Sequence, residues 1–235
     1  MEFHALPIVG LIEEAPRTRT FLFPKPEGLT WEPGAHIHVG LPGFDANGEH
    51  HPELVRVMSL CTVEREGRLG FTTRLDSSRS TFKRRLAAAK PGEELTFFKP
   101  GSELALRRDG RPVALVSQGV GIAAMRPIIL DYAHSQEGVP SLTSLTVDRG
   151  PRGIYRDRFA QLERELPALN FQRASHRDEL IAALAVVSAP TSSTFHVVGS
   201  ERFLADIVAE LRRLGVADEE IVLDRDERRR AEILG

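Results

Sequence analysis

The sequence LVSQGVGIAAMRP, residues 115–127, joins a run of apolar residues to two glycines and then to a helix-forming stretch. Gly119 and Gly121 allow a tight turn and a close approach of a ligand to the backbone, because glycine has no side chain to obstruct either. The free N–H groups at the start of the following helix favour an anion such as a nucleotide diphosphate. Gly119, Val120 and Gly121 are therefore candidate cofactor-binding residues. The same turn also occurs where a helix only packs closely on a sheet, so the pattern alone leaves both interpretations open.

From residue 109 to the end, strand-like segments alternate with helix-like segments. The predicted strands lie near residues 113–117, 142–147, 169–174, 194–198 and 220–223, and the predicted helices near 122–135, 156–166, 177–187 and 201–214. Strands that alternate with helices form a parallel sheet. Five strands with four crossovers predict a doubly wound nucleotide-binding domain, whose ligand lies beyond the carboxyl ends of the strands.

The first part of the chain, residues 1–108, has a different pattern. Short β-rich runs such as Thr20–Phe23 are separated by Gly, Pro and Asn, which is typical of a small antiparallel β-barrel. A helix predicted near residues 80–89 would cover one end of that barrel. The pattern changes at the charged turn Arg107–Pro112. The sequence therefore predicts a β-barrel domain over residues 1–108 and an α/β domain over residues 109–235.

The bulk composition excludes several classes of function. Lys and Arg total 31 against 33 for Asp and Glu, and the net charge of −2 gives no general attraction for nucleic acid or an anionic membrane. Cys61 is the only cysteine, which excludes an internal disulfide framework and a four-cysteine iron–sulfur or zinc site. The sequence has no signal-peptide pattern, and no apolar run approaches the roughly 18 residues of a membrane span. We therefore expect a cytoplasmic protein without a nucleic-acid or membrane partner.

A second motif, VRVMSL at residues 55–60, reads as a short strand with an arginine and a hydroxyl three residues apart. Arg56 and Ser59 lie on opposite faces of an ideal strand, because strand side chains alternate. A ligand that contacts both must wrap the strand, unless a bulge turns one of them. An extended dinucleotide is long enough to do so.

The two motifs together resemble those of the ferredoxin–NADP reductase superfamily, in which an Arg-x-Tyr-Ser-like strand precedes a Gly-x-Gly-Ile-x-x-x-Arg segment. Further segments match the family in the same order: Glu32–Gly34, Ser80–Phe82, Pro91–Leu95 and Val197–Ser200. The resemblance implies an FAD-binding barrel and an NAD(P)-binding α/β domain. It also implies a flavoprotein reductase that passes hydride from NAD(P)H to flavin N5. Since the chain lacks the cysteines of a fused ferredoxin, the electrons would leave to a separate flavodoxin, ferredoxin or oxygenase component.

The resemblance assigns FAD to the strand that carries the second motif. Arg56 would hold the pyrophosphate, Ser59 would be the catalytic hydroxyl near flavin N5, and Val57 and Met58 would line the cofactor between them. Met58 stands where the family usually has a tyrosine that stacks on the flavin ring. The segment Ser77–Phe82 corresponds to the family's phosphate-binding helix start, so Ser80 and Thr81 are candidates there. Either would equally serve as an ordinary N-cap.

In the second domain, Gly199 and Ser200 stand where the family has residues beside the nicotinamide, with Val198 in place of a cysteine. Ser175 and Arg177 resemble the pair that holds the 2′-phosphate in NADP-preferring members, which favours NADPH over NADH. The alternative is an N-cap serine followed by a solvated arginine. Arg149 is an additional candidate for a phosphate contact, although it also fits a plain turn.

Departures from the family pattern leave two other functions open. Met58 is one departure, and the charged segment Asp224–Arg230 is another, because it has no aromatic residue to cover the flavin. A non-catalytic relative on the same scaffold, or a reductase that binds free flavin as a substrate, would also fit. Lys83–Arg85 and Arg107–Arg108 are interpreted as solvated faces that could also dock an acidic carrier. His36 and His38, with the loop pair His50–His51, lack a carboxylate that would complete a metal site.

Overall fold

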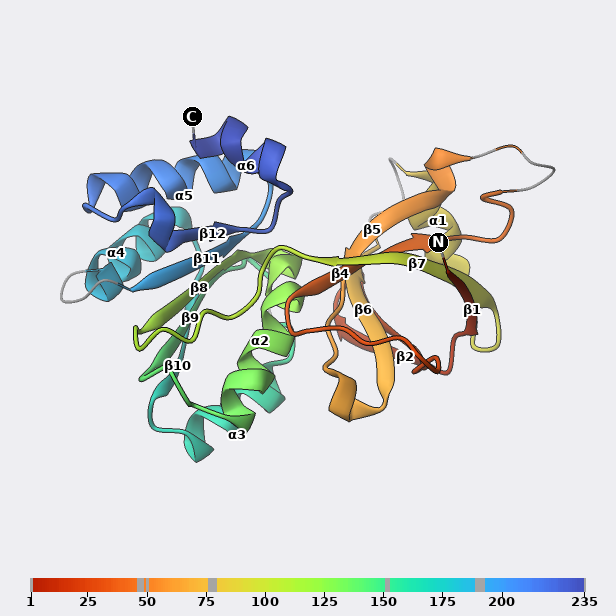
Figure 1. The fold of residues 1–235 in the computed structure, drawn as a ribbon, viewed down its shortest axis with the longest axis horizontal. Coiled ribbons are helices and arrows are strands. Elements are labelled where there is room, and N and C mark those ends of the chain that lie inside the picture. The colour runs from red at the N-terminus through yellow and green to blue at the C-terminus, as the bar shows by residue number, and fades with distance from the viewer. Residues whose placement is uncertain are drawn as a thin grey trace. The chain divides into compact units, whose positions relative to one another are not determined.

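The computed structural model describes residues 2–45, 49, 51–75, 80–150, 153–188 and 193–234. The chain divides into two compact units, Met1–Ser102 and Glu103–Gly235 (Figure 1). The division thus lies a few residues before the boundary at residue 108 that the sequence predicts. Within the described parts, no helix combines the length and the apolar character needed to cross a membrane.

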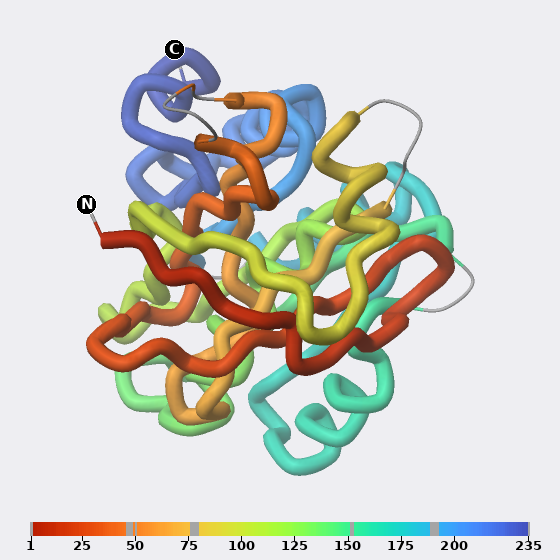
Figure 2. Tube along the Cα trace, turned by 90° about the vertical axis from the view of Figure 1, so that its right-hand side faces the viewer, coloured from red at the N-terminus to blue at the C-terminus, as the bar shows by residue number. Residues whose placement is uncertain are grey.

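The first unit consists of antiparallel sheets, as the sequence predicts. One sheet has four strands in the order β1-β7-β4-β5, and the other has three in the order β2-β3-β6. The strands are β1 (Phe3–Pro7), β2 (Gly10–Ala15), β3 (Thr18–Pro24), β4 (Ala35–Gly40), β5 (Val55–Ser59), β6 (Arg68–Arg74) and β7 (Glu94–Ser102). The first strand of the unit in sequence, β1, pairs antiparallel with the last one, β7 (Figure 2). A bridge between Leu60 and Phe71 joins the two sheets into a barrel-like domain.

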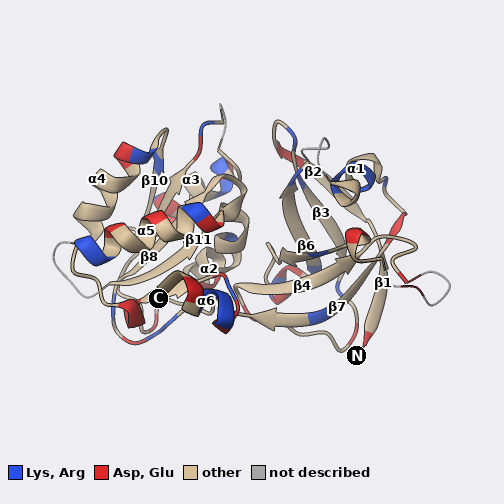
Figure 3. Ribbon diagram, turned by 90° about the horizontal axis from the view of Figure 1, so that it is seen from above, with Lys and Arg blue, Asp and Glu red and all other residues tan. Residues whose placement is uncertain are grey.

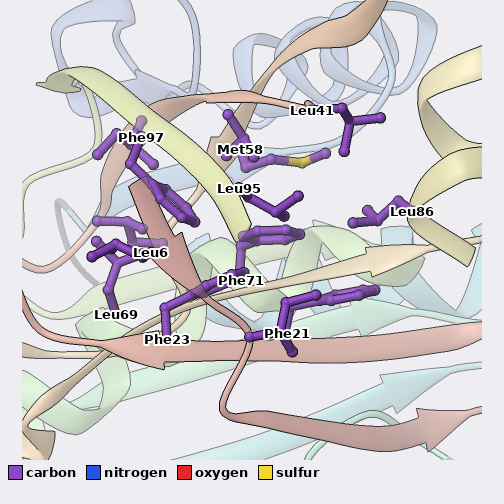
Figure 4. Packing of buried hydrophobic residues seen from close by; sticks show 14 of the residues in the cluster. Leu6, Phe21, Phe23, Leu41, Met58, Leu69, Phe71, Leu86, Leu95 and Phe97 are labelled. Atoms are coloured by element: carbon purple, nitrogen blue, oxygen red, sulfur yellow. The ribbon is translucent and has the colours of Figure 1, made fainter. Parts of the chain in front are cut away.

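Aromatic side chains from both sheets fill the interior of this unit (Figure 4). The ring centroids of Phe21 and Phe71 lie 5.3 Å apart, and those of Phe23 and Phe97 lie 4.6 Å apart. Helix α1 (Thr81–Ala88) packs over this core with Phe82 and Leu86, both fully buried. The helix therefore covers the core as its apolar spacing predicts.

The second unit is a parallel sheet with helices on both faces. Its strands are β8 (Val113–Gln118), β9 (Leu142–Val147), β10 (Leu169–Ala174), β11 (Thr194–Val198) and β12 (Ile221–Leu223), in the order β10-β9-β8-β11-β12. Every residue of β11 is buried, as expected for a central strand covered on both faces. Helices α2 (Ile122–His134) and α3 (Arg156–Glu165) cover one face, and α4 (Arg177–Ser188) and α5 (Glu201–Arg213) cover the other (Figure 1).

The strand order places a switch point in the middle of this sheet. The chain moves from β8 outward through β9 to β10, and then crosses to β11 on the other side of β8. Ligands of doubly wound sheets bind at the carboxyl ends of the strands where the order reverses. We therefore expect a ligand site at the loops that follow β8 and β11.

One helix is absent from the sequence prediction. Helix α6 (Glu227–Leu234) contains three arginines and two glutamates, and its charge is visible in Figure 3. Its apolar end, Ile233 and Leu234, packs against the core of the second unit. Arg229 forms an ion pair with Glu201 of α5 at 3.8 Å, and Arg230 donates to the Ile221 carbonyl of β12 at 3.4 Å. The charged segment Asp224–Arg230 thus leads into a helix that is held at both of its ends.

Candidate functional site

Strand β5 carries the second sequence motif, and its side chains alternate between two faces. Val57 is 54% exposed, whereas the next residue, Met58, is 8% exposed. The pairing with β4 runs without a shift from Ser59 opposite His36 to Val55 opposite Gly40. With no bulge in this pairing, Arg56 and Ser59 point to opposite faces. One ligand can contact both only by wrapping the strand.

The Met58 side chain lies in the barrel core. Figure 4 shows it among Leu41, Leu95 and Phe71, and it belongs to the main buried cluster of the first unit. A residue that stacks on a ligand ring must offer it an open face. At 8% exposure, the Met58 side chain offers little open face to such a ring.

Arg56 turns towards helix α1, where a second cation lies beside it. Its guanidinium carbon is 5.7 Å from the centre of the Phe82 ring. The Lys83 ammonium donates to the Thr73 hydroxyl of β6 and repels the Arg56 charge. In the described part of the chain, no carboxylate forms an ion pair with either residue; Arg56 donates to the backbone carbonyls of Pro52 and Val55. Two neighbouring cations that no carboxylate of the described residues neutralises favour the binding of an anion with more than one charge.

The interpretation of Lys83–Arg85 as a solvated face is wrong for Lys83. Arg84 and Arg85 are exposed, but Lys83 is half-buried between α1 and β6. Burial, with a smaller contribution from the Arg56 charge, lowers the pKa of Lys83 to about 8. Sequence reasoning missed this residue because the helix pattern cannot show that a neighbouring strand covers it.

Ser80 and Thr81 are at the start of α1. The Ser80 hydroxyl accepts a hydrogen bond from the Lys83 backbone N–H at 3.5 Å, so Ser80 is the N-cap of the helix. The Thr81 side chain is exposed and accepts a bond from Arg84 at 3.0 Å. Ser77–Arg79, the other part of the predicted phosphate-binding segment, lies outside the described residues. A phosphate contact by Ser80 or Thr81 stays a prediction.

The two-glycine turn follows β8 at the switch point. Gly119 has a φ of 55° in the left-handed region, and no atom lies within 4 Å of the position a Cβ would take. Gly121 precedes α2, and a Cβ there would lie 3.0 Å from the Val198 carbonyl oxygen of β11. Gly119 therefore leaves open space over the turn, whereas Gly121 lets α2 approach the sheet. Gly119 thus fits the interpretation of the pattern as a ligand-binding turn, and Gly121 fits the interpretation as close packing of a helix on the sheet. Val120, between them, is half-buried.

The loop after β11 meets this turn. The Ser200 hydroxyl lies 3.2 Å from the Gln118 side-chain oxygen and accepts a bond from the Phe203 N–H at 3.3 Å, which makes Ser200 the N-cap of α5. A Cβ on Gly199 would collide with the Phe203 ring at 2.3 Å, so this position requires glycine. The N-termini of α2 and α5 thus lie beside one another at the carboxyl ends of β8 and β11, and both favour a negative charge.

Replacing Gly121 with alanine should lower the free energy of unfolding by about 1–3 kcal/mol, because the new methyl group presses on a backbone carbonyl that cannot rotate away. Urea unfolding measures the change. Gly153→Ala is the matched control in the same unit, since the nearest atom to its new methyl is Arg173 Cδ at 3.9 Å. An equal loss in both variants would mean that the close approach of α2 to β11 is not what Gly121 provides.

The residues predicted to hold a 2′-phosphate follow β9 and β10, in the half of the sheet that lies on the other side of β8 from β11. Arg149 follows β9, and Ser175 and Arg177 follow β10. Helix α4 begins at Arg177, so His176, and not Ser175, is at the cap position. The Ser175 N–H donates to Glu179 at 2.7 Å, and Arg177 forms an ion pair with Asp206 of α5 at 2.7 Å. Both residues are exposed. The interpretation of Ser175 as an N-cap is therefore wrong, and Arg177 is an ion-paired rather than a merely solvated arginine.

Arg173 adds a basic residue to this edge that the sequence did not single out. It is on β10 and donates to the carbonyls of Asp148, at 3.2 Å, and Gly150. These bonds hold the loop that carries the exposed Arg149 against β10. The carboxyl ends of β9 and β10 therefore present several arginines to solvent.

The described histidines of the first unit lie apart from a set of metal ligands. Among the residues that the structure describes, no three His, Cys, Asp or Glu side chains lie close enough to hold a metal ion. The His38 ring lies 3.3 Å from the Lys99 carbonyl, and burial lowers the pKa of His38. His36 packs against the backbone of Gly101. His50 lies outside the described residues.

Comparison with known proteins gives matches by structure alone. No protein-family model and no curated protein sequence matches the chain. A ferredoxin NADP⁺ reductase from Neisseria gonorrhoeae, solved with bound FAD and NADP, matches with a TM-score of 0.81 at 18% identity, over 95% of this chain and 98% of the other. The FAD/NAD-binding domain of nitric oxide dioxygenase from Vibrio cholerae matches with a TM-score of 0.74 at 18% identity, over 94% and 97%. Phthalate dioxygenase reductase, described as transferring electrons from pyridine nucleotides to a [2Fe-2S] centre, matches with a TM-score of 0.72 at 18% identity, over 94% and 67%.

These matches extend over nearly the whole chain, so both units have the fold of ferredoxin–NADP reductase-type FAD/NAD-binding domains. The predicted fold class, an antiparallel β-barrel domain followed by a parallel α/β domain, is confirmed. At this level of identity the likeness concerns architecture, and the roles of individual residues rest on their own geometry.

Proposed function

We propose that the protein is a flavoprotein reductase that binds FAD in its first unit and NAD(P)H in its second. The observation that carries this proposal is that each unit of a reductase fold has its own group of residues suited to a diphosphate. These are Arg56 with Lys83 beside α1, and the Gly119–Gly121 turn at the switch point. FAD and NAD(P)H both contain a diphosphate, and each would find one such group.

The residues fit the anionic part of each cofactor. Arg56 and Lys83 would neutralise the FAD diphosphate, and the open space above Gly119 would admit the nucleotide backbone. Ser59, half-buried on the opposite face of β5, would donate its hydroxyl to the flavin edge. Bound flavin would supply the redox chemistry, taking two electrons from a reduced nicotinamide and releasing them one at a time. The protein's part is to bind and align the two cofactors.

We propose NADPH as the preferred nucleotide. The 2′-phosphate would be bound at the carboxyl ends of β9 and β10 by Ser175 and Arg177, with Arg149 beside them. Arg177 would have to leave Asp206, and this exchange costs little, since an exposed ion pair contributes about 0–1 kcal/mol. The side chains of Arg177 and Asp206 are 53% and 35% exposed.

Removing Arg177 should raise the dissociation constant of NADPH by about ten- to a hundredfold and leave that of NADH unchanged, because only NADPH carries the extra phosphate. Asp206→Asn should tighten NADPH binding, because it frees the guanidinium. Calorimetric titration measures both. Arg212→Ala is the control, since Arg212, in the last turn of the helix that carries Asp206, forms an exposed ion pair with Asp218, the two side chains being 42% and 43% exposed. An equal change for both nucleotides in Arg177→Ala would refute the assignment.

The electron acceptor would be a separate protein, a flavodoxin, a ferredoxin or an oxygenase component. Cys61 alone cannot hold an iron–sulfur cluster, so the electrons would pass to a centre outside the two units. The similar phthalate dioxygenase reductase is described as transferring electrons to a [2Fe-2S] centre, which supports an iron–sulfur acceptor.

The visible spectrum of the purified protein, followed by nucleotide oxidation with and without added FAD, tests the proposal against its rivals. A reductase with its own cofactor retains FAD after gel filtration and oxidises NADPH with ferricyanide as acceptor. A free-flavin reductase is colourless and oxidises NADPH only in proportion to added flavin. A non-catalytic relative oxidises no nucleotide in either assay, which would overturn the proposal.

A further inference from the structure

Arg225 follows β12 at the carboxyl end of the central sheet and is half-buried. One terminal nitrogen donates to the Gly199 carbonyl at 2.8 Å, and the other donates to the carbonyl of Asp224. Both acceptors are peptide carbonyls. Over the described parts of the chain, no carboxylate forms an ion pair with Arg225. A guanidinium that is partly withdrawn from water and lacks a counterion stabilises an anion that comes within reach.

A short series of contacts connects Arg225 to the two-glycine turn. Its acceptor Gly199 directly follows Val198, and the Val198 carbonyl is the atom against which Gly121 packs. The next residue, Ser200, contacts Gln118, which directly precedes Gly119. Arg225 therefore lies at the same edge of the sheet as the turn and is connected to it across the end of β11. The turn and the two helix N-termini offer only partial charges, and Arg225 adds a full positive charge.

We propose that Arg225 binds the diphosphate of the nicotinamide nucleotide. This inference rests on the proposed function and adds to it a residue that the sequence motifs do not assign. Because NADH and NADPH share the diphosphate, Arg225 would strengthen the binding of both, unlike Arg177. Two of the five guanidinium N–H groups already hold the Gly199 turn and the Asp224 carbonyl, and three remain for the ligand.

Two substitutions separate a charge contact from a structural role. Arg225→Lys keeps the positive charge, and Arg225→Gln keeps a hydrogen-bond donor for the Gly199 carbonyl but removes the charge. If Arg225 binds the diphosphate, Arg225→Gln should weaken NADH, NADPH and ADP-ribose alike, by about tenfold or more, while Arg225→Lys retains most of the affinity. The affinity should also depend less on salt in Arg225→Gln.

Calorimetric titration of the full chain with each ligand, at two salt concentrations, measures these effects. Arg228→Gln is the control, because the Arg228 side chain is 89% exposed and lies only three residues further on. If Arg225→Gln binds like the parent and Arg225→Lys does not, the arginine only holds the Gly199 turn and the inference is wrong. Unchanged affinity in both variants also overturns it. A parent protein that binds none of the three ligands would refute the proposed function itself.

Discussion

Arg56→Ala should bind FAD about ten- to a hundredfold more weakly than the parent protein, which corresponds to the loss of a charge-assisted contact of about 1.5–3 kcal/mol. Arg56 lies beside Lys83 and over the Phe82 ring, without a carboxylate partner in the described chain. A dinucleotide diphosphate is the natural counterion for such a pair. Quenching of FAD fluorescence on titration with protein measures the dissociation constant.

Arg85→Ala is the matched control for this substitution. Arg85 is on the same helix, but it is exposed and donates to the carbonyl of Pro42 at 2.9 Å. Its loss should leave FAD affinity within about twofold. If Arg56→Ala and Arg85→Ala bind FAD equally well, the diphosphate is not held beside Phe82, and the location of the flavin site must be abandoned.

FAD affinity should also fall as the pH rises above about 8, by up to about tenfold per pH unit. Burial lowers the pKa of Lys83 from 10.5 to about 8. Below that value the empty protein carries a charged ammonium, and above it a neutral amine that attracts no anion. A bound diphosphate favours the ammonium and raises the pKa of Lys83, so binding takes up a proton near and above pH 8.

Calorimetry in two buffers of different ionisation enthalpy counts the protons taken up at about pH 8.5. Lys83→Met should bind FAD without this uptake and with little pH dependence between about pH 7 and 9, while Arg84→Met should behave like the parent. If Lys83→Met takes up as many protons as the parent protein on binding FAD, Lys83 is not the source of the uptake.

The lowered pKa of Lys83 also makes the stability of the free protein depend on pH, in the opposite direction to FAD affinity. Because the unfolded lysine titrates near 10.5, the free protein should gain stability as the pH rises from about 8 to 10.5.

Most of the second unit can be predicted from sequence because strand-like segments alternate regularly with helix-like segments. The predicted segments 142–147, 169–174 and 194–198 coincide with β9, β10 and β11. Helix α6 could not be predicted in this way, since its charged residues show no apolar face. Its contacts are those of Ile233 and Leu234 with the core and of Arg229 and Arg230 with Glu201 and the Ile221 carbonyl. Pattern-based prediction finds elements that bury an apolar face along their whole length and misses those held by isolated contacts between distant segments.

The candidate site was less predictable, because its charges depend on contacts between distant segments. The glycine turn is a local feature and was found at Gly119 and Gly121. Lys83 became a candidate only when the structure brought it beside Arg56 and Thr73, and Arg225 only through its bond to Gly199. In sequence, both lie in runs of charged residues that are typical of solvated surfaces. Such runs give no indication of which member is covered by another element.

Anaerobic rapid mixing of the FAD-loaded protein with NADPH tests the central claim most directly. If the protein is a flavoprotein reductase, the visible absorbance of the flavin should disappear in a first-order phase far faster than that of free FAD at the same concentration. The rate should approach a limit as NADPH is raised, as expected when a bound nucleotide reduces a bound flavin. Loss of absorbance no faster than in free FAD, with FAD and NADPH both shown to be bound, would contradict the account.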